Sequence, residues 1–293
     1  MLRSMYTAIS GLRNHQSMLD TVANNIANVN TTAFKGSDTQ FKTLLSQTMS
    51  GAGAPSATLG GTNAKQVGLG MTIDSVTQNF TQGNLQTTGK GTDIAISGDG
   101  FFRVTNDMAG LGATPPNPVT QYMRAGNFKW DANGTLVTSD GSFVMGYAPL
   151  PPVAPSIMSP GPDMTTLTAI DFNPATQSDP LIGNDGTVTV LDTALNGRVA
   201  IGTISLARFS NPSGLHEDGA NKWSESLNSG APVTDVALAN GMGELGVGYL
   251  EMSNVDLATE FTEMIKAQRG FQANSRVITT SDEILQELVN LKR

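Results

Sequence analysis

Residues able to perform acid–base or metal chemistry are few and scattered in this chain of 293 residues. It contains two histidines, His15 and His216, and no cysteine. Neither histidine has a metal ligand or a triad partner nearby in the sequence. We place His15 on the surface face of a first helix and His216 in a loop. The sequence therefore predicts no catalytic residue and no metal site.

A glycine motif suggests nucleotide chemistry only formally. Gly241, Gly243 and Gly246 reproduce the G-x-G-x-x-G spacing that, in dinucleotide-binding proteins, joins a strand to a helix N-terminus and holds a pyrophosphate. No alternating strand and helix pattern surrounds these glycines, and residues 248–250 continue as strand-like sequence. We interpret the motif as a loop or bulge and predict no nucleotide binding and no cofactor.

Paired carboxylates leave one enzyme class open. Asp93 and Asp99 could in principle serve as the two carboxylates that a glycosidase needs.

The chain has 25 acidic and 17 basic residues, a net charge of -8, and this balance argues against binding to nucleic-acid phosphates. Polar residues interrupt every apolar run, so we expect neither membrane insertion nor a cleaved signal peptide.

The element at the start of the chain is an amphipathic helix through residue 26. Its apolar residues recur at alternating intervals of three and four, the heptad pattern of a coiled-coil seam. The helix ends in asparagine-rich sequence. Its expected subunit-interface residues are Leu2, Met5, Ile9, Leu12, Leu19 and Ile26.

The last element repeats this pattern between residues 257 and 289. Ser253 or Asn254 can cap this second helix. An apolar stripe must be buried, so we expect the helices to pack on each other and on neighbouring copies; a two-helix hairpin on a monomer core is the alternative. The second set of expected interface residues is Leu257, Phe261, Met264, Phe271, Ile278, Leu285, Leu288 and Val289.

Between the helices, short apolar alternations separated by Gly, Asn and Asp indicate strands and tight turns, including a two-residue hairpin turn at Asn133-Gly134. The predicted fold is a mainly β core with N- and C-terminal α-helices that form a coiled-coil-like inner domain. We expect a helical domain over 1–30 and 255–293, extended linkers over 31–71 and 241–254, a β-rich domain over 72–148 and 181–240, and a proline-rich excursion, a reduced outer domain, over 149–180.

The two ends resemble the flagellar rod and hook family of axial proteins. The resemblance rests on NNIANVNTTAFK at 24–35, with Ala33 where Gly is more usual, SNVDL at 253–257 and AQRGFQANS at 267–275. Within this family, residues 60–70 and 286–291 are most similar to hook proteins. The distal rod protein is the close alternative.

The resemblance implies a structural, non-enzymatic subunit of the flagellar hook. Such subunits polymerise into a hollow flexible tube, a universal joint that carries motor torque from rod to filament during swimming. The implied partners are further copies of the chain, the distal rod, hook cap and hook–filament junction proteins, and the type III export apparatus. The implied location is extracellular, in the flagellum, without a cleaved signal peptide. The alternative from another class is a secreted β-rich binding protein or adhesin.

Overall fold

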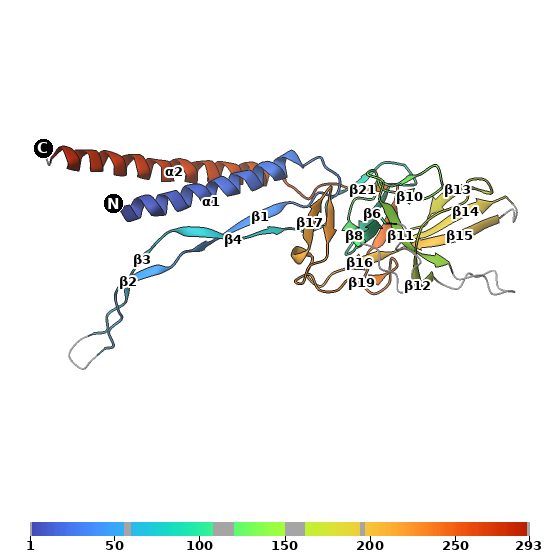
Figure 1. The fold of residues 1–293 in the computed structure, drawn as a ribbon, viewed down its shortest axis with the longest axis horizontal. Coiled ribbons are helices and arrows are strands. Elements are labelled where there is room, and N and C mark those ends of the chain that lie inside the picture. Colours follow the sequence, from blue (N-terminus) through green and yellow to red (C-terminus); the bar gives the residue numbers. More distant parts are fainter. Residues whose placement is uncertain (1, 56–59, 108–119, 150–161, 194–196, 292–293) are drawn as a thin grey trace. The chain divides into compact units, whose positions relative to one another are not determined.

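The computed structural model describes residues 2–55, 60–107, 120–149, 162–193 and 197–291 (Figure 1). They form two compact units, which we call the helical unit and the β unit. The helical unit comprises Met1–Val29, Gly36–Asn79 and Val255–Arg293, and the β unit comprises Asn30–Lys35 and Phe80–Asn254. The predicted β core with terminal helices is confirmed.

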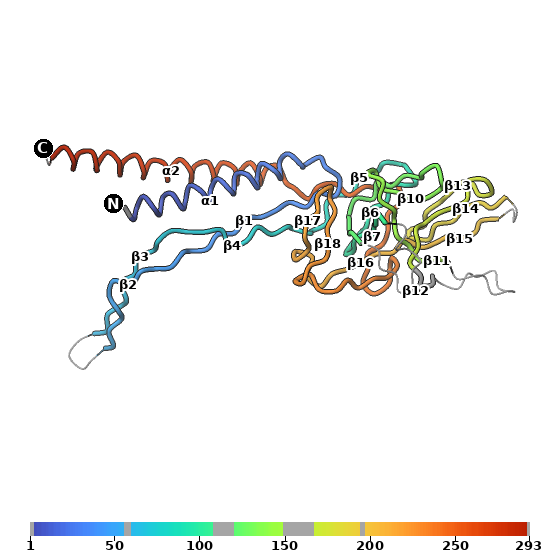
Figure 2. The backbone as a smooth tube through the Cα atoms, in the orientation of Figure 1, coloured from blue at the N-terminus to red at the C-terminus, as the bar shows by residue number. Residues whose placement is uncertain are grey.

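Two long helices dominate the helical unit. Helix α1 spans Leu2–Ala27 and α2 spans Leu257–Asn290. The two helices lie side by side and antiparallel, so that the first residues of α1 and the last residues of α2 lie at the same end of the pair (Figures 1 and 2). Asp256 caps α2, its side chain accepting a hydrogen bond of 3.1 Å from the Ala258 backbone N–H. The cap is therefore Asp256, and not Ser253 or Asn254, because the carboxylate lies within reach of the second free N–H.

An antiparallel strand pair covers another face of α1. Strands β1 (Ser37–Thr43) and β4 (Met71–Gln78) pair with a register shift between Gln40 and Phe41. The Asn14 amide donates to the Met71 carbonyl at 2.7 Å, and the Asn25 amide donates to the Ser37 carbonyl at 3.0 Å. Polar side chains thus fix the strand pair to the helix.

Beyond this pair, the chain continues as a hairpin arm of β2 (Ser46–Ser50) and β3 (Lys65–Gly68). Every residue of both strands is exposed. The predicted linker over 31–71 therefore contains strands β1 to β3, and the exposure of β2 and β3 shows that the arm has no core of its own. Cross-strand backbone hydrogen bonds order the arm where apolar burial does not.

The β unit is built around one 13-stranded antiparallel sheet in its described part. Its main path runs in the order β13, β14, β15, β11, β7, β8, β18, β17, with β9, β10, β12, β16 and β19 attached beside it. Two smaller pairs, β20 with β6 and β21 with β5, complete the unit. The strands are β5 (Leu85–Thr87), β6 (Ile94–Ser97), β7 (Phe101–Thr105), β8 (Thr120–Met123), β9 (Lys129–Trp130), β10 (Leu136–Val137), β11 (Phe143–Pro149), β12 (Pro162–Ala169), β13 (Gln177–Ile182), β14 (Thr187–Asp192), β15 (Gly197–Ile204), β16 (Leu206–Arg208), β17 (His216–Gly219), β18 (Lys222–Ser224), β19 (Val233–Asp235), β20 (Glu244–Val247) and β21 (Tyr249–Glu251), with a 3-10 turn η1 (Pro212–Gly214).

Alternating apolar residues of these strands form the core of the β unit. Phe102 packs edge-to-face on Phe128 at 5.0 Å between ring centroids, and both rings are buried. A second cluster gathers Phe101, Tyr122 and Trp223. The burial of such large rings supplies much of the hydrophobic stabilisation of a domain of this size.

The structure changes three details of the predicted organisation. Residues 241–254, expected as a linker, contain β20 and β21. The proline-rich stretch 149–180 contains β12, which pairs at the edge with β11, and the start of β13; residues 150–161 lie outside the described part. The hairpin turn at Asn133-Gly134 is wider than two residues, because the Asp131 N–H donates to the Thr135 carbonyl, with Gly134 at φ 83°. Proline is tolerated in the edge strand β12 because it lacks only the backbone N–H donor, which an edge position can leave unpaired.

A buried charge cluster ties four distant segments of the β unit together. The Glu251 carboxylate accepts from Lys35 Nζ at 2.7 Å and from Arg124 Nε at 3.1 Å, and the backbone N–H of Gly83 donates to it at 2.9 Å. The side chains of Lys35 and Glu251 have 0% exposure and that of Arg124 has 4%. Lys35 and Glu251 lie close in sequence to two of the points, Lys35–Gly36 and Asn254–Val255, at which the chain passes between the β unit and the helical unit.

Candidate assembly interface

Small and polar residues of α1 and α2 meet at two levels of the helix pair. A Cβ atom placed on Gly11 would lie 2.5 Å from Nδ2 of Asn274, and one on Gly270 would lie 2.5 Å from Nε2 of His15. The glycines therefore let the helices approach at these two levels. Ala267 in α2 is fully buried at 0% exposure. The face of α2 that meets α1 thus lacks large side chains there.

His15 lies in this helix pair, so its predicted surface position is wrong. Its ring is half-buried and contacts Phe41 of β1 edge-to-face, with ring centroids 6.1 Å apart. The Nδ1 atom is buried without a hydrogen-bond partner among the described residues. The spacing argument failed because it assigned every polar residue between seam positions to solvent, whereas Gly270 creates space for an imidazole ring.

The predicted interface residues of α1 are half-buried. This applies to Met5, Ile9, Leu12, Leu19 and Ile26, while nothing is described of the side chain of Leu2. The buried apolar residues of α1 are Ala8 and Val22, at 3% and 5% exposure. The helix pair and strands β1 and β4 therefore use much of the surface of α1 within a single copy.

The predicted residues of α2 divide into two groups. Met264, Ile278 and Leu285 are half-buried, whereas Leu257, Phe261, Phe271, Leu288 and Val289 are exposed. Three further exposed apolar residues, missed by the strict heptad spacing, are Ile265, Val277 and Ile284. We call the exposed residues the apolar set of α2: Leu257, Phe261, Ile265, Phe271, Val277, Ile284, Leu288 and Val289.

This apolar set is the main candidate binding surface of the helical unit. Phe261 is 50% exposed and Ile265 is 58% exposed, and the other members lie between 38% and 69%. Single exposed apolar side chains are common on proteins, but eight of them on one 34-residue helix make α2 a candidate interaction element. At about 3.6 residues per turn, Leu257, Phe261 and Ile265 lie on one flank of the helix, and Val277, Ile284 and Leu288 lie on the other. A sequence scan for every apolar residue of the helix, without a fixed heptad, would have found Ile265, Val277 and Ile284.

A pocket lined in part by carboxylates lies where α2 begins. It encloses about 320 Å³ and is lined by residues of α1, β1 and α2, among them Asp38, Glu260 and Glu263. Burial, the largest cause, raises the pKa of Glu260 above its ordinary value of 4.5, and the carboxylates of Asp38, Glu263 and Asp256 raise the pKa further. A hydrogen bond of 3.1 Å from the Asn25 amide opposes this shift.

The residues considered for chemistry have structural surroundings. Gly241 and Gly243 form the turn before β20, and a Cβ on Gly243 would lie 2.4 Å from the Ser97 carbonyl oxygen, so close backbone packing explains this glycine. No helix follows the motif, which removes the geometry needed to hold a pyrophosphate. His216 lies in exposed strand β17 and not in a loop.

The two carboxylates considered for catalysis have different surroundings in the described part of the chain. Asp93 is buried at 6% exposure, and its carbonyl accepts from the Gly248 N–H. Asp99 borders a pocket of the β unit. Within the described ranges, no group of three His, Cys, Asp or Glu side chains could hold a metal ion. Neither described helix has the combination of length and apolar character that crossing a bilayer requires.

Comparison with known proteins identifies the family. Three family models match: "Flagella basal body rod protein" over residues 5–35, "Flagellar hook protein FlgE/F/G D1 domain" over 95–190 and "Flagellar basal body rod FlgEFG protein C-terminal" over 247–291. The flagellar basal-body rod protein FlgG of Bacillus subtilis is 47% identical over 295 positions, covering 100% of both chains. FlgG of Borreliella burgdorferi is 38% identical over 298 positions, again covering 100% of both.

A hook protein is also among the relatives. The flagellar hook protein FlgE of Borreliella burgdorferi is 29% identical over 452 positions that cover 100% of both chains. These relatives are structural flagellar proteins, and their similarity extends over the helices and the β unit alike. The chain therefore belongs to the FlgE/F/G family of structural proteins of the flagellar rod and hook.

Proposed function

We propose that this chain is a subunit of the distal rod of the flagellar basal body. The observation that carries the proposal is end-to-end similarity to FlgG rod proteins, at 47% identity over 295 positions with the Bacillus subtilis protein. The hook relative aligns over 452 positions, far more than the 293 residues of this chain, at 29% identity. The comparisons thus favour the rod over the hook that residues 60–70 and 286–291 suggested.

The proposed rod is a hollow tube of many copies. Contacts between unlike surfaces of successive copies build an open helical assembly when the rotation from one copy to the next does not close a ring. The apolar set of α2 supports this proposal, since burying it against neighbouring copies is favourable at about 25 cal/mol per Å² of apolar surface. The predicted interface residues on α1 would join these contacts where they remain half-exposed.

The exposed hairpin arm is a second observation that supports the proposal of a stiff rod. Leu45, directly before β2, is 85% exposed, and Met49 within β2 is 70% exposed, although both are large apolar residues. In the helical unit such an arm gives each copy a further element for contact with its neighbours. More contacts per copy resist bending, which suits a rod that carries torque.

In this proposal the chain is not an enzyme, and its partners are other copies, the adjoining rod and hook proteins, and the type III apparatus that exports it. Its place is the extracytoplasmic part of the flagellum. The hook cap and the hook–filament junction proteins belong to the hook interpretation.

Electron microscopy of concentrated purified protein tests the proposal. We expect straight tubes from the full chain; curved tubes would favour the hook. The variant Phe261→Asp/Ile265→Asp should keep its helical circular dichroism, because both side chains are exposed, and should form no tubes. The matched control, Ala258→Asp/Thr262→Asp, places the same charges at the same spacing on neighbouring exposed positions. If Phe261→Asp/Ile265→Asp forms tubes at the same protein concentration as Ala258→Asp/Thr262→Asp, the proposed role of the exposed apolar residues of α2 is contradicted.

A further inference from the structure

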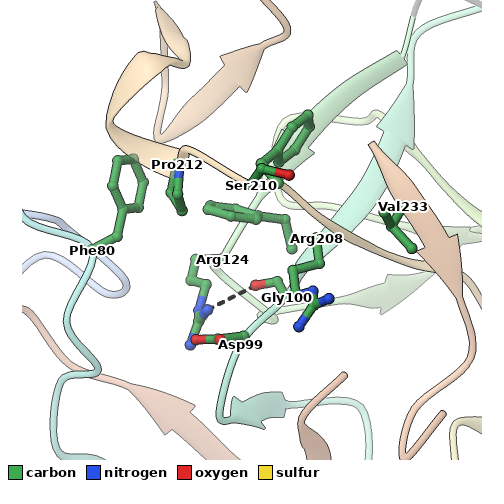
Figure 3. A pocket seen from close by; sticks show the side chains of 10 residues that line it. Phe80, Asp99, Gly100, Arg124, Arg208, Ser210, Pro212 and Val233 are labelled. Carbon is green, nitrogen blue, oxygen red and sulfur yellow. Dashed lines mark hydrogen bonds between the residues drawn. The ribbon is translucent and has the colours of Figure 1, made fainter. Parts of the chain in front are cut away.

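A pocket of the β unit combines aromatic walls with an unpaired cation. It encloses about 390 Å³, and Phe80, Phe101, Phe209 and Pro212 supply apolar lining. Figure 3 shows Phe80 and Pro212 on one side of the pocket and the Arg208 side chain on the other. Across the described residues, the Arg208 guanidinium has no hydrogen-bond or ion-pair partner. The pocket therefore suits a group with an apolar body and a neighbouring negative charge.

A loop of the same unit presents these two features. Leu227 has a relative exposure of 107%, so no part of its side chain is covered, and the nearby Glu225 is exposed as well. Glu225 has no hydrogen-bond partner in the part of the chain that the structure describes. We call residues 225–231 the leucine loop.

Hydrogen bonds hold the leucine loop in one conformation. Ser226 Oγ donates to the Gly214 carbonyl at 2.5 Å, the Ser226 N–H donates to Ser229 Oγ at 3.0 Å, and the Asn211 amide donates to the Asn228 carbonyl at 3.1 Å. Exposure of a leucine alone would carry no conclusion. A leucine displayed on an ordered turn, however, loses little conformational entropy when it binds, which favours a role as a contact residue.

We propose that the leucine loop of one copy docks into the aromatic pocket of the next copy. Leu227 fills the space between the phenylalanine rings and Pro212, and the Glu225 carboxylate pairs with the Arg208 guanidinium. Apolar fit and charge complementarity point to the same occupant. Each copy inserts its loop into one neighbour and receives the loop of another, as an open tube requires. The inference rests on the proposed assembly and adds a contact between β units.

Charge reversal tests the pairing. Arg208→Glu and Glu225→Arg should each raise the protein concentration needed for tube formation about tenfold, as loss of a well-formed interface contact does. The combined variant Arg208→Glu/Glu225→Arg should restore tube formation, because the pair re-forms with its charges exchanged. Lys129→Glu, an equal charge change at an exposed position of β9, is the control and should leave assembly unchanged.

The absence of cysteine from the chain permits a second test. Equal amounts of Leu227→Cys and Ser210→Cys, distinguishable by mass, are mixed and oxidised, and disulfides joining the two variants are expected. Disulfides only between two Leu227→Cys copies would overturn the proposal, as would folded charge variants that assemble like the unaltered chain. If the unaltered chain forms no tubes while mixed disulfides appear, the distal-rod proposal fails and the docking contact stands. If the unaltered chain forms tubes, but neither mixed disulfides nor rescue by the combined charge variant is observed, the docking contact fails and the distal-rod proposal stands.

Discussion

Replacing Glu251 by glutamine tests the buried charge cluster of the β unit. The variant keeps the shape of the side chain but leaves Lys35 and Arg124 without the counter-charge that lies 2.7 Å and 3.1 Å from them. Removing one partner of a buried ion pair costs about 3–5 kcal/mol. Since a domain is stable by about 5–15 kcal/mol in total, Glu251→Gln should bring the β unit close to unfolding.

Urea denaturation followed by tryptophan fluorescence measures this loss. Both tryptophans of the chain, Trp130 and Trp223, lie in the β unit, so the signal reports this unit alone. The control is Arg198→Met, which breaks an ion pair with Asp179 whose side chains are 37% and 63% exposed. That change should cost less than about 1 kcal/mol. A loss for Glu251→Gln no larger than for the control would refute the reasoning.

The pH dependence provides a second check on the same variant. Burial, the largest cause, lowers the pKa of Lys35 below its ordinary value of 10.5, and Glu251 opposes this shift. Without Glu251 the pKa of Lys35 should fall further. A lysine with a lowered pKa in the folded state destabilises the fold while it is charged, and the penalty decreases as pH rises through the folded-state pKa. The stability cost of Glu251→Gln should therefore shrink between neutral pH and pH 10.

Two further predictions concern the helical unit. Gly270→Val should separate the helices at His15 and cost about 1–3 kcal/mol, measured by thermal melting of the helical circular dichroism, with Ala273→Val as the exposed control; equal melting temperatures would count against close packing at Gly270. Glu260→Gln should stabilise this unit at neutral pH by about 0.2–0.5 kcal/mol for each like-charge pair that it removes. Because the pKa of Glu260 is raised, the native state favours its protonated form, so the benefit should vanish as pH falls below 4.5 in the same melting assay; a gain that persists at pH 3 would contradict this cause.

The sequence by itself determined the elements and the class of this protein. Heptad spacing predicts both terminal helices, and α1 ends at Ala27, within the asparagine-rich sequence that starts at Asn24. Alternation of apolar residues indicates strands such as β14, in which Val188 and Val190 are buried and Thr187 and Thr189 are half-buried, because a strand with one buried face must alternate. These are local properties, fixed by which side chains are apolar and how far apart they lie.

Only the tertiary structure decided which surfaces meet. The helices pair through Gly11, Gly270 and Ala267, and leave Phe261 and Ile265 exposed, because close approach of small residues competes with burial of a wide apolar stripe. The ion pair of Lys35 with Glu251 joins residues 216 positions apart, and no spacing rule relates such positions. Periodicity shows that a face is apolar or polar, but the choice of its partner depends on shape and charge contributed by distant parts of the chain.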